Sequence, residues 1–214
     1  MVLPFALWGT AMAAMAPLVG TGGPFLVAFL RLLPAGATLL IAVPILGRRL
    51  AIAQSDWIWF VIFTVVDASI FQFCLARGLA ETGAGLGSVL IDSQPLLVAL
   101  LARALFGEAI NPVGWFGLLI GLGGIICLGS PPEFLSQWLL MGEAGSLEGF
   151  WTHGEGWMFA AAIAMALGTV LIRFACRSSD PVAVTGWHMV FGSVPLFAWH
   201  YFDSSSNFWP DWTF

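Results

Sequence analysis

The stretch LWGT at residues 7–10 occurs a second time, in modified form, as ALGT at residues 166–169. With one two-residue gap the segments that follow these stretches align, and Arg31 then falls opposite His188. An odd number of long apolar stretches separates the two copies, so the copies would lie in a membrane with opposite orientations. Two copies of one unit in opposite orientations are typical of secondary transporters built from inverted repeats.

The composition indicates a membrane protein. Hydrophobic residues make up 59% of the chain, charged residues make up 9%, and the mean hydropathy is +0.93. A soluble domain carries about 25% charged residues. A helix needs about 20 apolar residues to cross a hydrocarbon core. We therefore predict an all-α membrane protein with seven transmembrane helices, at residues 4–21, 25–47, 57–76, 84–106, 112–130, 155–173 and 182–202.

The repeat divides the chain into three parts. Residues 1–130 form a first repeat of five spans, and residues 131–154 form an acidic outer loop that holds Glu133, Glu143 and Glu148. We expect residues 155–214 to begin a second repeat with two spans and this repeat to be incomplete. We expect the apolar part of the long loop either to lie in the membrane interface or to pack on the bundle.

The arginines predict the orientation. Five of the seven lie at span ends that share one side, while acidic residues collect on the other side. The positive-inside rule puts the arginine-rich side and the N-terminus in the cytoplasm, or in the stroma of a plastid. The five are Arg48, Arg49, Arg103, Arg173 and Arg177.

Several classes of function are disfavoured. The chain has no Lys and no basic run that would hold nucleic acid. It lacks the nucleotide-binding motif GxxxxGK[ST] and the enzyme motifs GxSxG and HExxH, so we predict that it is not an enzyme. Its three cysteines lack CxxC spacing and its three histidines are scattered, so we predict neither a metal site nor a cofactor.

Two acidic residues lie inside predicted spans. Asp67 is in the third span and Asp92 is in the fourth, at similar distances from the turn between them. Both carboxylates would therefore lie about 12–16 Å below the outer interface. An ionisable group there is costly unless it is paired, protonated or hydrated. Either the two acids line an aqueous cavity that binds substrate or a proton, or they pair with Arg31 or with freed backbone groups.

Further residues extend this candidate site. Gln72, Ser93, Gln94 and His188 join Asp67, Asp92 and Arg31 as expected substrate-binding or cavity-lining residues. Pro95 should kink the fourth span, because proline removes a helical hydrogen bond. Polar residues beside a proline at membrane depth often line a cavity. The alternative is that this span is a bent helix that serves packing alone. Four glycines of the fifth span form a small-residue face for close helix packing, namely Gly114, Gly117, Gly121 and Gly124.

Six strings of the sequence carry a resemblance to a known family. They are LWGT at 7–10, SVLIDSQP at 88–95, FGE at 106–108, GEGW at 154–157, SDP at 179–181 and TGWHM at 185–189. Taken together, they resemble the EamA-type transporters of the drug/metabolite superfamily. The resemblance covers essentially the whole chain and is strongest to the branch found in cyanobacteria and plant plastids. It implies ten helices in two inverted repeats, a central substrate cavity, and export of small metabolites, amino acids or drugs by exchange or proton coupling. We expect helices eight to ten of that pattern to be missing from this chain.

Two functions in different classes follow. The first is a secondary transporter that exports or exchanges small metabolites. It would contact membrane lipid, and it could form a homodimer or bind partners in a membrane complex. The alternative is a transporter-derived scaffold subunit of a larger membrane complex, such as a photosystem supercomplex. That subunit would hold lipid, carotenoid or chlorophyll, and His188, Gln72 or Glu155 would be the ligand of the chlorophyll magnesium. The expected location is a plastid membrane (envelope or thylakoid) or a bacterial inner membrane.

Overall fold

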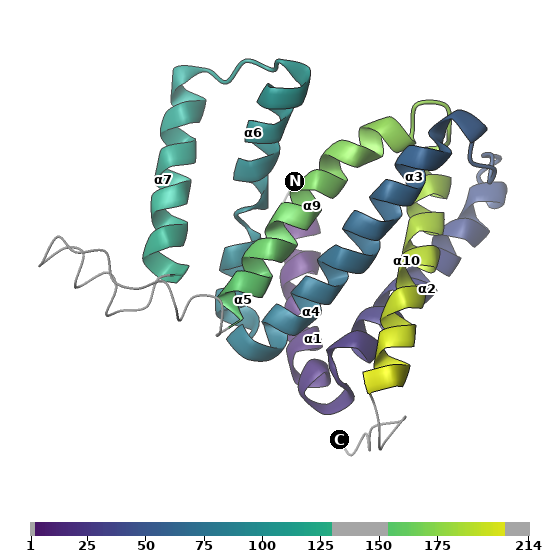
Figure 1. Cartoon of the computed structure of the whole chain (residues 1–214), viewed down its shortest axis with the longest axis horizontal. Coiled ribbons are helices and arrows are strands. Elements are labelled where there is room, and N and C mark those ends of the chain that lie inside the picture. Colours follow the sequence, from purple (N-terminus) through teal and green to yellow (C-terminus); the bar gives the residue numbers. More distant parts are fainter. Residues whose placement is uncertain (1–2, 130–153, 204–214) are drawn as a thin grey trace, which may run out of the picture.

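The computed structural model describes residues 3–129 and 154–203 as an all-helical bundle (Figure 1). The prediction of an all-α membrane protein is confirmed. Seven helical rods are present in these two ranges. Five rods are single helices, namely α1 (Leu3–Gly22), α2 (Pro24–Ile45), α7 (Pro112–Gly129), α9 (Glu155–Ala175) and α10 (Pro181–Asp203). The third rod follows α2 and joins four segments: the 3₁₀ turn Gln54–Asp56, α3 (Trp57–Phe63), the π-helical segment η2 (Thr64–Ile70) and α4 (Phe71–Thr82). The fourth rod consists of α5 (Ala84–Ile91) and α6 (Gln94–Phe106).

The predicted spans agree with these rods at most ends. The third rod is the main difference, because it continues to Thr82 where the sequence predicted an end at residue 76. Five rods of the described chain are long and apolar enough to cross a membrane, and two shorter apolar stretches lie at Gly9–Gly20 and Pro112–Ile125. The predicted acidic loop lies outside the described residues, apart from Gly154.

Glycine makes the two tightest connections between rods. Gly23 joins α1 to α2 at a φ of 78°, and Gly83 joins α4 to α5 at a φ of 77°. Backbone in this left-handed region carries little cost only for glycine. Pro24 then begins α2, where its fixed φ and missing N–H suit the first helical turn. At these two places consecutive rods therefore follow each other with almost no loop between them.

The fourth rod breaks at Asp92 and Ser93, which form a turn between α5 and α6. Ser93 N–H donates to the Leu90 carbonyl, three residues back, so the α-helical ladder stops here. Pro95 occupies the first turn of α6 and offers no N–H to continue the ladder of α5. The interruption divides the rod into a segment of 8 residues and one of 13.

The helices that carry the aligned residues Arg31 and His188 pack directly on each other. The contact between α2 and α10 is the most extensive in the bundle. It depends on Gly36, where an added Cβ would lie 2.8 Å from the Met189 Cβ and 2.9 Å from the Gly186 carbonyl oxygen. α9 lies between α3, α4, α5 and α6 and contacts each of them. The core of α1, α4, α5 and α9 includes Met12, Leu75 and Met158.

The small-residue face of α7 is only partly covered. Gly121 lies against Leu96 of α6, and Gly114 lies against Ile110 and Asn111. A Cβ added at Gly117 or Gly124 would meet no described atom of another helix within 4 Å, and Figure 1 shows α7 at the margin of the bundle beside α6. A packing role for these last two glycines stays a prediction.

A polar network ties together one end of the bundle. The carboxylate of Asp56, which is 1% exposed, accepts hydrogen bonds from Ser178 N–H at 2.8 Å, Ser179 Oγ at 2.8 Å and Ser55 Oγ at 3.1 Å. Ser179 Oγ also accepts from Ala53 N–H at 2.9 Å. The connection before α3 is thereby fastened to the connection between α9 and α10.

Two ion pairs lie at this same end. Arg48 Nη1 is 3.4 Å from Asp180 Oδ2, and Arg173 Nη1 is 3.1 Å from Glu108 Oε1. Asp180 also accepts hydrogen bonds through Oδ1 from the first amides of α10, at 2.8 Å for Val182. This N-cap explains why α10 begins at Pro181.

Candidate solute pocket

A cavity of about 420 Å³ opens between α2, the third rod, α9 and α10. This volume is within the range of small-molecule sites. Its apolar wall includes Leu32, Phe63, Phe71, Ile172 and Met189. The polar lining residues are Arg31, Asp67, Gln72, Thr169, Thr185 and His188. The cavity thus combines an apolar wall with a few convergent polar groups.

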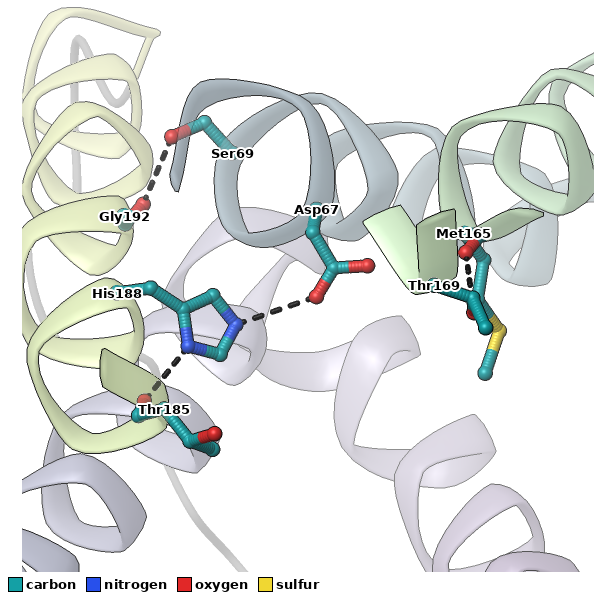
Figure 2. A network of polar contacts seen from close by, with 7 residues as sticks. All are labelled: Asp67, Ser69, Met165, Thr169, Thr185, His188 and Gly192. Atoms are coloured by element: carbon teal, nitrogen blue, oxygen red, sulfur yellow. Dashed lines mark hydrogen bonds and ion pairs between the residues drawn. The ribbon is translucent and has the colours of Figure 1, made fainter. Parts of the chain in front are cut away.

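Asp67 and His188 meet at the wall of this pocket (Figure 2). His188 Nε2 is 3.2 Å from Asp67 Oδ2, and His188 Nδ1 is 2.6 Å from the Thr185 carbonyl oxygen. The imidazole ring also stacks on Phe63, with the ring centroids 4.4 Å apart and the planes at 27°. The two side chains are 6% and 22% exposed for His188 and Asp67. Three contacts therefore hold the ring of His188 in one orientation.

If both contacts of His188 are hydrogen bonds, their chemistry sets the number of protons on this pair. A carbonyl oxygen can only accept, so the Nδ1 atom of His188 must carry a hydrogen that it donates to Thr185. The contact between Nε2 and the Asp67 carboxyl group is then a hydrogen bond only if one further proton lies between them. That proton gives either an imidazolium beside a carboxylate or a neutral imidazole beside a carboxylic acid. The pair has no net charge in either case.

Asp67 is positioned by a π-helical turn and by a glycine. In the segment η2 the Phe71 N–H donates to the carbonyl of Val66, five residues back, as in a π-helix. Such turns occur often at functional sites. Any side chain at position 168 would overlap the carboxyl group of Asp67, so Gly168 is what allows α9 and η2 to approach.

Arg31 contributes the positive charge of the pocket. It is half-buried on α2, and its Nη1 lies 3.4 Å from the sulfur of Met15. Arg31 also lines a second cavity of about 310 Å³ between α1 and α2, whose other lining residues are apolar. The sequence placed Arg31 close to one of the two acids, and the structure puts it on the same pocket wall as Asp67.

The structure does not bring all the expected residues together. Gln72 is buried and lines the pocket with Arg31, Asp67 and His188. Asp92, which we expected at the cavity wall, is exposed, and neither it nor Ser93 or Gln94 lines the pocket. Gln94 lies beside it, because its Nε2 donates to Thr169 Oγ1 at 3.0 Å. The Ser93 hydroxyl is buried with no hydrogen-bond partner among the described residues.

Sequence reasoning missed four residues that shape the pocket, namely Phe63, Gly168, Thr169 and Thr185. Gly168 and Thr169 belong to the repeated stretch ALGT, and that repetition was a signal of their place in the bundle. Phe63 lies in a run of aromatic and aliphatic residues, which gives no indication that its ring would stack on a histidine.

A pocket with charged groups inside a bundle of apolar helices is typical of integral membrane proteins that move solutes or ions. The model of the EamA-like transporter family matches residues 1–130 and 152–214. The chain belongs to the EamA-like transporter family, which is one of transporters and not of enzymes. The resemblance read from the sequence motifs is thereby confirmed.

Relatives are found in cyanobacteria, a plant, other bacteria and an archaeon. An uncharacterized transporter of Synechocystis is 48% identical over 203 residues, covering 92% of this chain and 61% of the relative. A chloroplastic WAT1-related protein of Arabidopsis thaliana is 46% identical over 198 residues, covering 92% of this chain and 46% of the relative. An inner membrane protein of Escherichia coli is 34% identical over 94 residues, covering 42% of this chain and 28% of the relative. No solved structure gives a significant match.

Proposed function

We propose that this chain is the substrate-binding part of a secondary transporter that moves a small metabolite across its membrane. The observation that carries the proposal is the pocket in which Arg31, Asp67, Gln72 and His188 converge. Charged groups inside a bundle are costly, and they mark substrate and ion pathways in membrane proteins. The family membership supports the same function.

The pocket draws on both predicted repeats. α2 and the third rod supply Arg31 and Asp67, while α9 and α10 supply Thr169 and His188. Sites at the interface of inverted repeats suit alternating access, in which one bundle moves against the other. The division into repeats at 1–130 and 155–214, with the loop at 131–154 between them, remains part of this proposal.

The chain spans 61% and 46% of the lengths of its two relatives from Synechocystis and Arabidopsis. The activity is therefore proposed for the full-length protein. One of these relatives is described as chloroplastic and others are bacterial, and on that basis we place the present protein in a plastid or bacterial membrane. The thylakoid is one option within a plastid.

Transport can be tested without knowing the solute. Vesicles that contain the full-length protein are loaded with a mixture of organic acids, amino acids and amines, and the solutes that leave are identified by mass spectrometry. At least one solute should leave faster than from protein-free vesicles. Asp67→Asn should slow this efflux strongly, and Asp92→Asn should slow it less, because Asp92 lies outside the pocket lining.

A different outcome would favour the scaffold. If the folded full-length protein releases no solute, and the native protein is recovered tightly bound in a larger membrane complex, the transporter proposal is wrong. Lipid or pigment recovered with that complex would indicate what the scaffold holds.

A further inference from the structure

The charges of the pocket lining can be summed for each protonation state of the Asp67–His188 pair. Among the lining residues, the titratable side chains are those of Arg31, Asp67 and His188. With one proton between Asp67 and His188 the pair is neutral, and the guanidinium of Arg31 leaves the lining with a charge of about +1. Without that proton the pair is negative, and the charge of the lining falls to about 0.

Other titratable groups on the surrounding helices lie outside this lining. On α9, α10 and the third rod these groups are at or near the helix ends, apart from Cys74 within α4, and several have partners of their own. Arg77 and Glu81 pair at 3.1 Å, Arg173 pairs with Glu108, and Asp180 pairs with Arg48. The remaining ones with described side chains are Asp56, Cys74, Glu155, His200 and Tyr201.

We propose that the pocket binds a small organic monoanion together with one proton, with Arg31 facing the anion and the proton held between Asp67 Oδ2 and His188 Nε2. This inference deepens the proposed function by naming the class of solute and the coupling group. In a weakly polar site a monoanion is favoured by a lining charge of +1 and loses that advantage when the charge is 0. The solute and the proton therefore bind together and leave together.

The geometry also explains why proton loss alters the site. When the proton leaves, lone pairs of Nε2 and Oδ2 face each other at 3.2 Å, because Thr185 keeps the other hydrogen on Nδ1. This arrangement is repulsive, so the carboxylate and the ring must separate. The ring is held by Phe63, which leaves the Asp67 side chain as the part that turns. The apolar wall that includes Leu32, Phe71 and Met189 suits a solute with an apolar body.

The test uses two probes with the same ring, benzoate as a monoanion and benzylamine as a monocation. Binding of each to the full-length protein in detergent is measured by isothermal titration calorimetry. Titrations in buffers of different ionisation enthalpy give the number of protons taken up per benzoate. We expect saturable benzoate binding, no comparable benzylamine binding, and uptake of about one proton on the alkaline side of the transition. There the affinity should fall about tenfold per pH unit.

Three variants sharpen the test. Asp67→Asn keeps the lining at about +1 with a neutral His188, so benzoate should bind without proton uptake and with little pH dependence. Arg31→Gln should abolish benzoate binding, because it removes the positive charge. His200→Gln is the matched control, since His200 is a buried histidine on the same helix that does not line the pocket. It should leave both the affinity and the proton count unchanged.

The inference is overturned if benzoate binds with no proton uptake across the range from about pH 5 to about pH 8, in which histidines commonly change charge. It is also overturned if benzylamine binds more tightly, or if folded protein binds no benzoate at any pH. Because these are binding measurements, they can fail while vesicles still release another solute. In that case the proposed transport function stands and only the solute class and its proton are wrong.

Discussion

Gly168 of α9 lies so close to Asp67 of the segment η2 that any side chain at position 168 would overlap the carboxyl group. The third rod and α9 therefore meet at the residue that forms the hydrogen bond to His188. The position of Asp67 in the pocket depends on a missing side chain in a neighbouring helix.

Gly168→Ala should destabilise the protein and displace Asp67. In a helix interior, Gly→Ala normally stabilises by up to about 1 kcal/mol, but overpacking a filled site costs about 1–3 kcal/mol. We expect the second effect to win, with a lower melting temperature and weaker benzoate binding. Gly117→Ala is the control, because a Cβ added at position 117 would meet no described atom of another helix within 4 Å. The melting temperature of this variant should stay level or rise. Equal melting temperatures for the two variants would contradict this contact.

Asp56→Asn should weaken the polar network that joins the connections before α3 and α10. The carboxylate accepts three hydrogen bonds, and an amide would turn a donor toward one of these donors. Leaving a buried polar group unsatisfied costs about 1–3 kcal/mol. Thermal unfolding of purified protein measures the loss. Glu108→Gln is the comparison, because the Arg173–Glu108 pair is over half exposed and should contribute much less.

Cys176, just after α9, should react slowly with maleimide at neutral pH. Burial, together with the nearby carboxylates of Asp56 and Asp180, raises the pKa of this thiol to about 11. The reactive thiolate is therefore scarce at pH 7, and its fraction should rise about tenfold per pH unit with no plateau near pH 9. A variant in which Cys74 and Cys127 are replaced by Ser isolates the signal.

The pH profile separates this effect from simple shielding. An unperturbed cysteine in a short peptide has a pKa of about 8.5, so its rate levels off above about pH 9. If Cys176 levelled off at the same pH as the peptide, the raised pKa would be refuted even if labelling were slow throughout.

The orientation can be tested with single cysteines in a background without the native thiols. Arg49 follows α2 at the arginine-rich end, and Glu81 lies at the far end of α4. In intact bacterial cells that express the protein, a membrane-impermeant maleimide should label the Glu81→Cys variant. It should label the Arg49→Cys variant only after the cells are permeabilised. The reverse pattern would invert the orientation, and labelling of both from outside would contradict the opposite placement of these ends.

The helical architecture could be predicted because the apolar runs are long and glycine or proline separates them. The spans at 84–106 and 155–173 agree closely with α5–α6 and α9. The third rod was predicted too short, because Arg77 and Glu81 resemble a loop in sequence, while in the structure they pair one turn apart on a continuing helix.

The site was harder to predict because it depends on which residues meet across helices. Polarity within a span identified Asp67, and the repeat identified His188, but neither pattern indicated that these two would pair. Asp67 and Asp92 were grouped only because both were expected at a similar depth in the membrane. Depth does not fix the direction in which a side chain points, and the turn at Asp92 and Ser93 leaves Asp92 exposed.

The π-helical segment Thr64–Ile70 also constrains how this chain can change in length. Each residue of an α-helix turns the chain by about 100° about the axis. The wider π-helical turn holds one residue more than an α-helical turn. Deletion of a single residue within this segment would therefore let it wind as an ordinary α-helix and would leave α4 close to its present orientation relative to α3. The same deletion in α4 itself would turn the residues that follow by about 100° away from α9, although the hydrophobicity of the span would hardly change. The π-helical segment is thus the place where this rod can lose a residue and keep its register in the bundle.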